Sequence, residues 1–191
     1  MLDAHCAHKV VMIFAQIGGS LDLRGATLAG LDLSGASIAG DLALGEPGKP
    51  AVWTGKNGEP GALTLRNAHV GNLMDAKDAW PEMYAEPTKG HLHLDGFTFN
   101  HLGGYAGETE PEMRARGMEW WDKWARLDPD YSPAPYAQLA AALTSAGDRD
   151  AANDIRYYGR VRERETEKGL AFVWSGTHQA LAGDRDQQGI Y

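Results

Sequence analysis

The sequence predicts a mainly β fold with an α-helical cap: a short right-handed quadrilateral parallel β-helix of about three coils, followed by three or four helices. Three observations lead to this prediction. Apolar residues recur every five positions between residues 21 and 44, and the chain repeats itself at an offset of 21 residues. Further along, a capping box at residues 109–112 precedes a stretch with helical periodicity. We therefore divide the chain into a β-helix, residues 1–104, and a helical capping region with a polar C-terminal tail, residues 105–191.

The five-residue period is clearest in LDLRGATLAGLDLSGASIAGDLAL, residues 21–44. The apolar positions five apart are Leu23, Leu28, Leu33 and Ile38, and another apolar residue stands two positions before each. An apolar-x-apolar pair places both side chains on one face of a short strand. The corners between the pairs hold Gly25, Gly30, Gly35 and Gly40. Because glycine tolerates the dihedral angles of a sharp corner, four such sides close one square coil.

The 21-residue offset extends the repeat toward the N-terminus. It aligns Val10 with Leu31, Met12 with Leu33, Ala15 with Ala36, Ile17 with Ile38, Gly19 with Gly40, Leu21 with Leu42 and Leu23 with Leu44. The first coil is therefore expected at about residues 6–17, with little chain before it to cover its strand edges. We expect this end to be covered by a second copy of the chain, which predicts a homodimer through the N-terminal coil, or by residues that precede this sequence.

Two insertions interrupt the repeat after Leu44. Segment 46–62 is rich in proline and glycine, and segment 75–90 contains two prolines among aromatic residues. Between the two segments the register returns at Leu63, displaced by 32 residues. Long loops on a rigid scaffold commonly carry binding residues. The alternative is that both insertions fold back over the wall of the β-helix. The candidate partner-binding residues are Trp53, Trp80 and Tyr84 in the insertions and Trp121 in the helical region.

The last coil is HLHLDGFTFN, residues 91–100, with large rings at its inner positions. A helix is expected from Thr109 to Leu127, where Trp120, Trp121 and Trp124 would plug the end of the β-helix, with Trp121 the more exposed of the first two. A second helix is expected between Ser132 and Gly147. A third begins after Asp148 and is expected to end at Gly169, before a short fourth helix.

The run A-x-L-x-G-L-x-L-x-G-A, residues 26–36, resembles the pentapeptide-repeat family, whose members fold as square β-helices. Together with the helices downstream, residues 10–181 are similar to a bacterial group of pentapeptide-like proteins often labelled membrane-associated oxidoreductases. Leucine stands at several inner positions where the strict repeat prefers alanine, and the apolar C-terminal segment of that group is shortened here to a polar tail.

Composition narrows the classes of function. A net charge of −8 argues against a nucleic-acid or anionic-membrane binder, since such proteins need clustered Lys and Arg. Cys6 is the only cysteine, which excludes an intrachain disulfide framework. No stretch approaches the roughly 20 apolar residues of a membrane-spanning helix. We therefore expect a cytoplasmic protein with no stable membrane insertion.

A search for chemistry yields no catalytic or cofactor-binding residue. His91 and His93 flank an inward leucine and lie close enough for two metal ligands, but only His101 could add a third, so no metal site is predicted. The sequence therefore favours a non-catalytic binding or scaffolding module for a protein partner. Two alternatives remain open. The first is a DNA-mimic protein that binds type II topoisomerases, as some pentapeptide-repeat proteins do, and the second is a ligand-binding or redox enzyme, as the group label implies.

Overall fold

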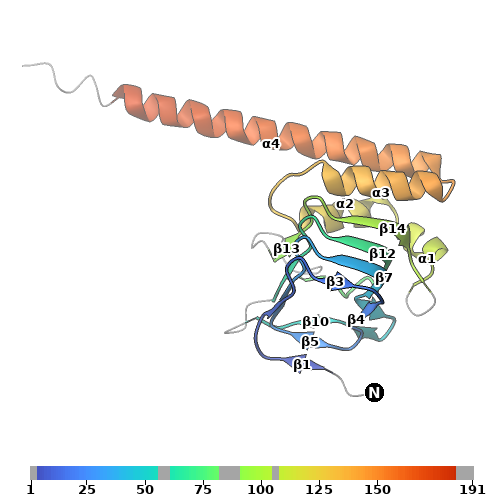
Figure 1. Cartoon of the computed structure of the whole chain (residues 1–191). Helices are drawn as coiled ribbons and strands as arrows, with labels where there is room; N and C mark the ends of the chain where they lie inside the picture. The colour runs from blue at the N-terminus through green and yellow to red at the C-terminus, as the bar shows by residue number, and fades with distance from the viewer. Residues whose placement is uncertain (1–3, 56–60, 82–90, 105–107, 184–191) are drawn as a thin grey trace, which may run out of the picture.

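The computed structural model describes residues 4–55, 61–81, 91–104 and 108–183. Within these ranges the chain forms parallel β-sheets followed by four C-terminal helices. Short strands stack in layers, the N-terminal layer lies at one end of the stack, and the helices cover the other end (Figure 1). This mixed arrangement confirms the predicted order of strands first and helices second.

The strands return repeatedly to the same sheets. The first layer holds β1 (His5–Cys6), β2 (Val10–Val11), β3 (Gln16–Ile17) and β4 (Leu21–Asp22). The second holds β5 (Thr27–Leu28), β6 (Gly30–Asp32) and β7 (Ser37–Ala43), and the third holds β10 (Val52–Trp53), β11 (Ala62–Thr64) and β12 (His69–Met74). The last holds β13 (Leu92–His93) and β14 (Thr98–Leu102). The sheet orders are β1-β5-β10, β13-β11-β6-β2 and β14-β12-β7-β3, with β4 also paired to β7.

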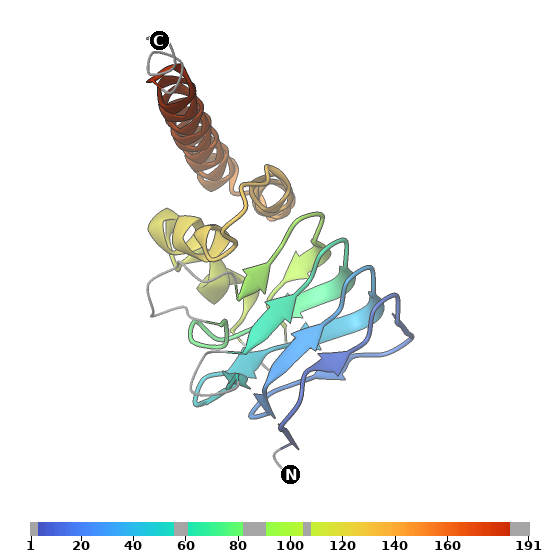
Figure 2. The ribbon, with the colours of Figure 1, turned by 90° about the vertical axis from the view of Figure 1, so that its left-hand side faces the viewer.

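The register of these pairs follows the repeat in the sequence. Val10 pairs with Leu31, Leu31 with Leu63, and Leu63 with Leu92, all in parallel. In the neighbouring sheet Ile17, Ile38, Val70 and Phe99 align in the same way. These pairs confirm the 21-residue offset and its displacement to 32 residues after the first insertion. Figure 2 shows the strands of successive layers, blue to green, side by side below the helices.

The buried core runs continuously from the strands into the helices. Its β part comprises the inward residues of the repeat, among them Leu33, Ile38, Leu63, Val70, Leu92 and Phe97. Its helical part includes Met113, Trp121, Trp124, Leu139, Leu143 and Ile155. The side chains of the first layer, such as Met12 and Ile17, pack on this core but are only partly buried. The core therefore thins toward the N-terminal end of the stack.

Four helices follow the last layer: α1 (Glu110–Arg114), α2 (Met118–Arg126), α3 (Ala134–Ser145) and α4 (Arg149–Gly183). The predicted capping box is present, because the backbone N–H of Thr109 donates to the Glu112 carboxylate over 2.8 Å. The single helix predicted over residues 109–127 is wrong. Gly117 adopts φ +83° and divides it into α1 and α2. No helix within the described ranges is both long and apolar enough to cross a membrane.

The predicted break at Gly169 is also wrong, since α4 continues without interruption to Gly183. A glycine inside a helix costs about 1 kcal/mol, which is too little to end a helix by itself. At Gly147, by contrast, the chain takes φ +85° and α3 does end, as predicted. A glycine thus coincides with a helix end where its backbone adopts a positive φ, as at Gly147, and not where it stays helical, as at Gly169.

The insertions contribute to the wall of the stack where the structure describes them. In segment 46–62, β8 (Gly45–Glu46) and β9 (Lys49–Pro50) form a small antiparallel pair, and β10 joins the first sheet. In segment 75–90, Ala76, Ala79 and Trp80 are buried in the core. These parts fold back over the stack, which is the alternative that the sequence left open. Residues 56–60 and 82–90, which include Tyr84, lie outside the described residues.

Candidate functional site

Two of the four candidate partner-binding residues, Trp80 and Trp121, belong to one tryptophan cluster, and a third, Trp53, is bonded at its edge. Trp80 and Trp121 both pack against Trp124, with ring centroids 5.3 and 5.6 Å apart and rings nearly perpendicular. The half-buried Trp53 lies beside them, since its indole N–H donates to the carbonyl of Ala79 over 2.7 Å. Edge-to-face packing of this kind stabilises aromatic pairs beyond their buried area. Tyr84, the fourth candidate, lies outside the described residues.

This cluster is buried, so it does not present a tryptophan surface to a partner. Trp80 and Trp121 are 2% and 0% exposed, and the prediction that Trp121 is the more exposed neighbour is wrong. The half-buried residue is Trp120, which packs edge-on against Trp121. Because the helix breaks at Gly117, α2 runs in its own direction. A prediction based on one continuous helix therefore assigned the wrong tryptophan to the exposed face. The three helical tryptophans fill the helical end of the stack, as the plug interpretation predicts.

A buried ion pair lies beside the tryptophans. Arg116 donates two hydrogen bonds to Asp75, of 2.7 and 3.0 Å, and a third to Glu108, of 2.8 Å. The side chains of Arg116 and Asp75 are both fully buried. Asp75 also accepts the indole N–H of Trp80, and the Arg116 guanidinium lies 4.4 Å from the ring centroid of Trp120. The pair thus joins the second insertion to the link between α1 and α2.

The surroundings act on the two charges of this pair in opposite ways: burial raises the pKa of Asp75, although Arg116 and the Trp80 indole lower it. Burial by itself would lower the pKa of Arg116, but the carboxylates of Asp75 and Glu108 outweigh burial and raise it. Its donors are directed into the cluster and away from solvent. We therefore interpret the pair as a structural joint.

A polar cleft lies where the last layer meets the turn between α2 and α3. Its volume is about 470 Å³, and Arg66, Asp95, Asp128, Asp130 and Ser132 contribute to its lining. The buried carboxylate of Asp128 accepts the backbone N–H groups of Leu94, at 2.7 Å, and of Asp130, at 3.1 Å. The Ser132 hydroxyl donates to Asp95 over 2.6 Å. These bonds fix the turn onto the β layers.

His93 stands at the edge of this cleft. Burial and the nearby Arg66 guanidinium both lower its pKa, so the imidazole is neutral at neutral pH. Its Nδ1 lies 3.2 Å from an Arg66 nitrogen and 4.0 Å from Asp128. Because a guanidinium only donates, Nδ1 accepts from Arg66. His93 is thus held beside the cleft by Arg66 and Asp128. The Ser132 hydroxyl, which a histidine could activate as a nucleophile, bonds to Asp95 instead of His93. Across the described part of the chain, no three His, Cys, Asp or Glu side chains gather as a metal site would require.

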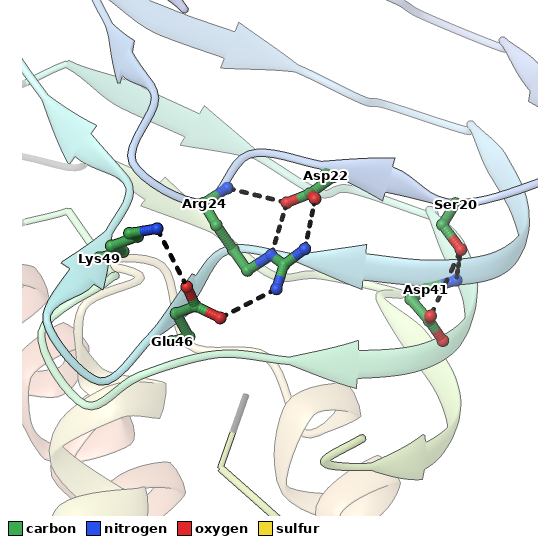
Figure 3. A network of polar contacts seen from close by, with 6 residues as sticks. All are labelled: Ser20, Asp22, Arg24, Asp41, Glu46 and Lys49. Carbon is green, nitrogen blue, oxygen red and sulfur yellow. Dashed lines mark hydrogen bonds and ion pairs between the residues drawn. The ribbon is translucent and has the colours of Figure 1, made fainter. Parts of the chain in front are cut away.

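A charged network ties the first layer to the second on the outer wall of the stack (Figure 3). Arg24 donates to Asp22, over 2.6 and 2.8 Å, and to Glu46, over 2.9 Å. Glu46 is also 3.7 Å from Lys49. Elsewhere in the same view the Ser20 hydroxyl accepts the backbone N–H of Asp41 at 2.9 Å. Lys9 and Asp32 make a further link between the two layers, at 2.8 Å.

These links predict that the first layer loosens in acid. Burial by itself would raise the pKa of Asp32, but hydrogen bonds from Lys9 and Ser34 lower it, and the hydrogen bond from Arg24 lowers the pKa of Asp22. A lowered carboxyl pKa contributes stability that is full above the unfolded value of about 3.9 and is lost as pH falls through the folded value.

The measurement is the free energy of unfolding in urea between about pH 6 and pH 3. We expect Asp32→Asn to flatten this pH dependence more than Asp22→Asn, because Asp32 is the more buried carboxylate. An unchanged slope in Asp32→Asn would contradict the prediction.

The N-terminal layer exposes several large apolar side chains. Val11, Ile13 and Phe14 are 60%, 46% and 75% exposed. β2 and β3 are terminal in their sheets, so one edge of each pairs with no other strand in the ranges that the structure describes. The sequence predicted an uncovered first coil here but did not single out these three side chains.

No protein-family model, curated protein or solved structure matches this chain.

Proposed function

We propose that this chain is a non-catalytic binding and scaffolding module built on a right-handed quadrilateral β-helix of the pentapeptide-repeat kind. The strand register supports the β-helix, because successive passes of the chain join the same sheets at matching offsets. The five-residue period supports square coils with inward pairs. On this proposal the described layers are the coils.

Polar side chains on the outer walls of the stack bond to one another. Asp22, Asp32 and Asp41 each bond to a neighbour on the wall, and their partners come from the same or the adjacent layer. The helical end of the stack is filled by the tryptophan cluster. This leaves the N-terminal end as the place where the scaffold meets another protein.

One observation carries the proposal: residues 10–21 of the first layer are uncharged and expose apolar side chains. Natural proteins usually guard an open strand edge with charges, proline or a covering segment. Residues 10–21 contain no Asp, Glu, Lys, Arg or Pro, and Val11 and Phe14 are exposed among them. An edge of this kind pairs readily with a further strand. The binding surface of the module is therefore the N-terminal edge, which we define as residues 10–21.

The test is site-specific photo-crosslinking in the cells that make the protein. A benzoylphenylalanine in place of Phe14 is expected to give discrete protein adducts on illumination. The matched control carries the same group in place of Tyr157, which is also exposed but lies on α4. Equal adducts at both positions, or none at position 14, would contradict a binding function for the N-terminal edge.

A further inference from the structure

A groove lies between the turn that precedes α3, the start of α3 and the middle of α4. Its volume is about 330 Å³, and Tyr131, Tyr136, Gly159, Arg160 and Glu163 are among the residues that line it. Pockets that bind small organic molecules begin at about this volume. Figure 1 shows α3 and α4 side by side at the end of the stack opposite the first layer. The groove is therefore remote from the N-terminal edge and has room for a small ligand.

The floor of the groove is aromatic and uncharged. Tyr136 is buried, and its ring lies against α4 at Gly159, where an added Cβ would stand 3.0 Å from the ring. Burial raises the pKa of Tyr136 to about 12, so the phenol stays protonated and donates to Asp122 over 2.9 Å. The half-buried Tyr131 lines the same groove. Because aromatic rings pack favourably against one another, this floor favours an aromatic ligand.

Two opposite charges stand at the rim of the groove. Arg160 and Glu163 lie one turn apart on α4 and are exposed, and neither side chain forms a hydrogen bond or ion pair with any residue in the described ranges. The nearby Glu165 is bonded to Arg126 instead, over 2.8 Å. Glu163 is close enough to Tyr131 to act with burial in raising the pKa of that phenol, which places its carboxylate on the groove side of α4.

The other cation of the lining already has neutral partners. The Arg156 guanidinium donates to Asn153 over 3.1 Å and to Thr144 over 3.3 Å. The charge preference of the groove is therefore set by Arg160 and Glu163. A phosphate group is repelled by Glu163, and a simple amine is repelled by Arg160. A small molecule that carries both a carboxylate and an ammonium group satisfies both side chains.

A free aromatic amino acid combines these features. Its carboxylate pairs with the guanidinium of Arg160, its ammonium group pairs with the carboxylate of Glu163, and its ring packs on the two tyrosines. We infer that the groove between α3 and α4 is a binding site for a free amino acid with an aromatic side chain. This site lies at the helical end of the stack, so the inference does not depend on the N-terminal edge.

The experiment is a titration of the full chain with L-tryptophan, followed through amide chemical shifts. We expect saturable shifts at ligand concentrations on the order of 1 mM, confined to the turn before α3, the start of α3 and the middle of α4. Two analogues test the charges of the ligand. Tryptamine lacks the carboxylate and N-acetyltryptophan lacks the ammonium group, so each is expected to bind about tenfold more weakly than tryptophan.

Variants at the rim assign each charge to its partner. Arg160→Met is expected to weaken tryptophan binding about tenfold and to leave tryptamine binding unchanged, because tryptamine has no carboxylate to lose a partner. Glu163→Gln is expected to weaken tryptophan binding similarly and to leave N-acetyltryptophan binding unchanged. Arg164→Met is the matched control, since Arg164 is exposed on α4 but does not line the groove, and it leaves all three affinities unchanged.

A further variant closes the groove without changing its charge. Ala137 lines the groove from α3 and is exposed, so Ala137→Phe is expected to keep the fold and to abolish the shifts. The inference is overturned if tryptophan gives no saturable shifts with the wild-type protein, or if tryptamine binds the wild-type protein as tightly as tryptophan does. Equal losses of tryptophan binding in Arg160→Met and Arg164→Met would also overturn it.

Discussion

Arg116→Met is expected to lower the free energy of unfolding by about 3–5 kcal/mol. The substitution leaves the carboxylate of Asp75, which is fully buried, without its cation and with only the Trp80 indole as a side-chain hydrogen-bond donor. A buried charge without its partner is among the costliest defects in a protein interior. The effect is measured by urea denaturation followed through tryptophan fluorescence, since Trp80, Trp120 and Trp121 lie beside the pair.

A double-mutant cycle separates the ion pair from simple loss of packing. Asp75→Asn alone is also expected to destabilise the protein, because it leaves Arg116 buried with Glu108 as its remaining carboxylate. The double variant with Arg116→Met removes both charges and is expected to cost less than the sum of the two single changes. Additive losses would contradict a coupled pair.

Arg126→Met is the matched control. Arg126 also bonds to two carboxylates, those of Asp122 and Glu165 at 2.8 Å each, but a third of its side chain is exposed to solvent. Exposed pairs of this kind contribute about 0–1 kcal/mol. If Arg116→Met and Arg126→Met had similar costs, burial would not be the source of the stability at Arg116.

Arg162→Met is expected to cost about 2–4 kcal/mol, the second largest effect of a single change. Arg162 lies on α4 and is buried, and its guanidinium donates to the carbonyl oxygens of Ala125, at 2.6 Å, and Asp128. These carbonyls lie at the C-terminal end of α2, where a helix has unpaired acceptors and negative partial charge. Arg162 therefore caps α2 and attaches α4 to it.

Arg162→Lys tests the geometry of this cap. Lysine keeps the positive charge but lacks the planar fork that reaches two carbonyls together, so we expect an intermediate loss of stability. Arg160→Met, an exposed neighbour on the same helix, is the control and is expected to change stability by less than about 0.5 kcal/mol. Amide hydrogen exchange in the last turn of α2 should quicken in Arg162→Met and not in Arg160→Met.

The features that could be predicted from the sequence are those that repeat locally. Pairs such as Val10 with Leu31 and Leu63 with Leu92 follow from periodicity, because each layer places its apolar residues beside those of the layer before it. The capping box at Thr109 and the helix end at Gly147 could also be predicted, because each is determined by a few neighbouring residues.

The candidate site could be predicted only in part. Trp80 and Trp121 do pack in one cluster, but the ion pair beside them joins Arg116 to Asp75, which are 41 residues apart along the chain. The cleft at His93 depends on Asp128, which bonds to Leu94 across 34 residues. Neither the Arg116–Asp75 contact nor the Asp128–Leu94 contact can be recognised from the sequence, because residues in distant segments can meet at any spacing along the chain.

The sequence by itself determined the period of the strands, their register through both insertions, the change from strands to helices and the neutral N-terminal edge. Each is a property of neighbouring residues or of a repeat. Only the tertiary structure decided where Gly117 turned the chain, that Gly169 stayed helical, and which tryptophans were buried. Those outcomes depend on the balance between the small cost of a glycine in a helix and the packing of α2 and α4 on the stack, and packing energy is set by segments that are far apart in the chain.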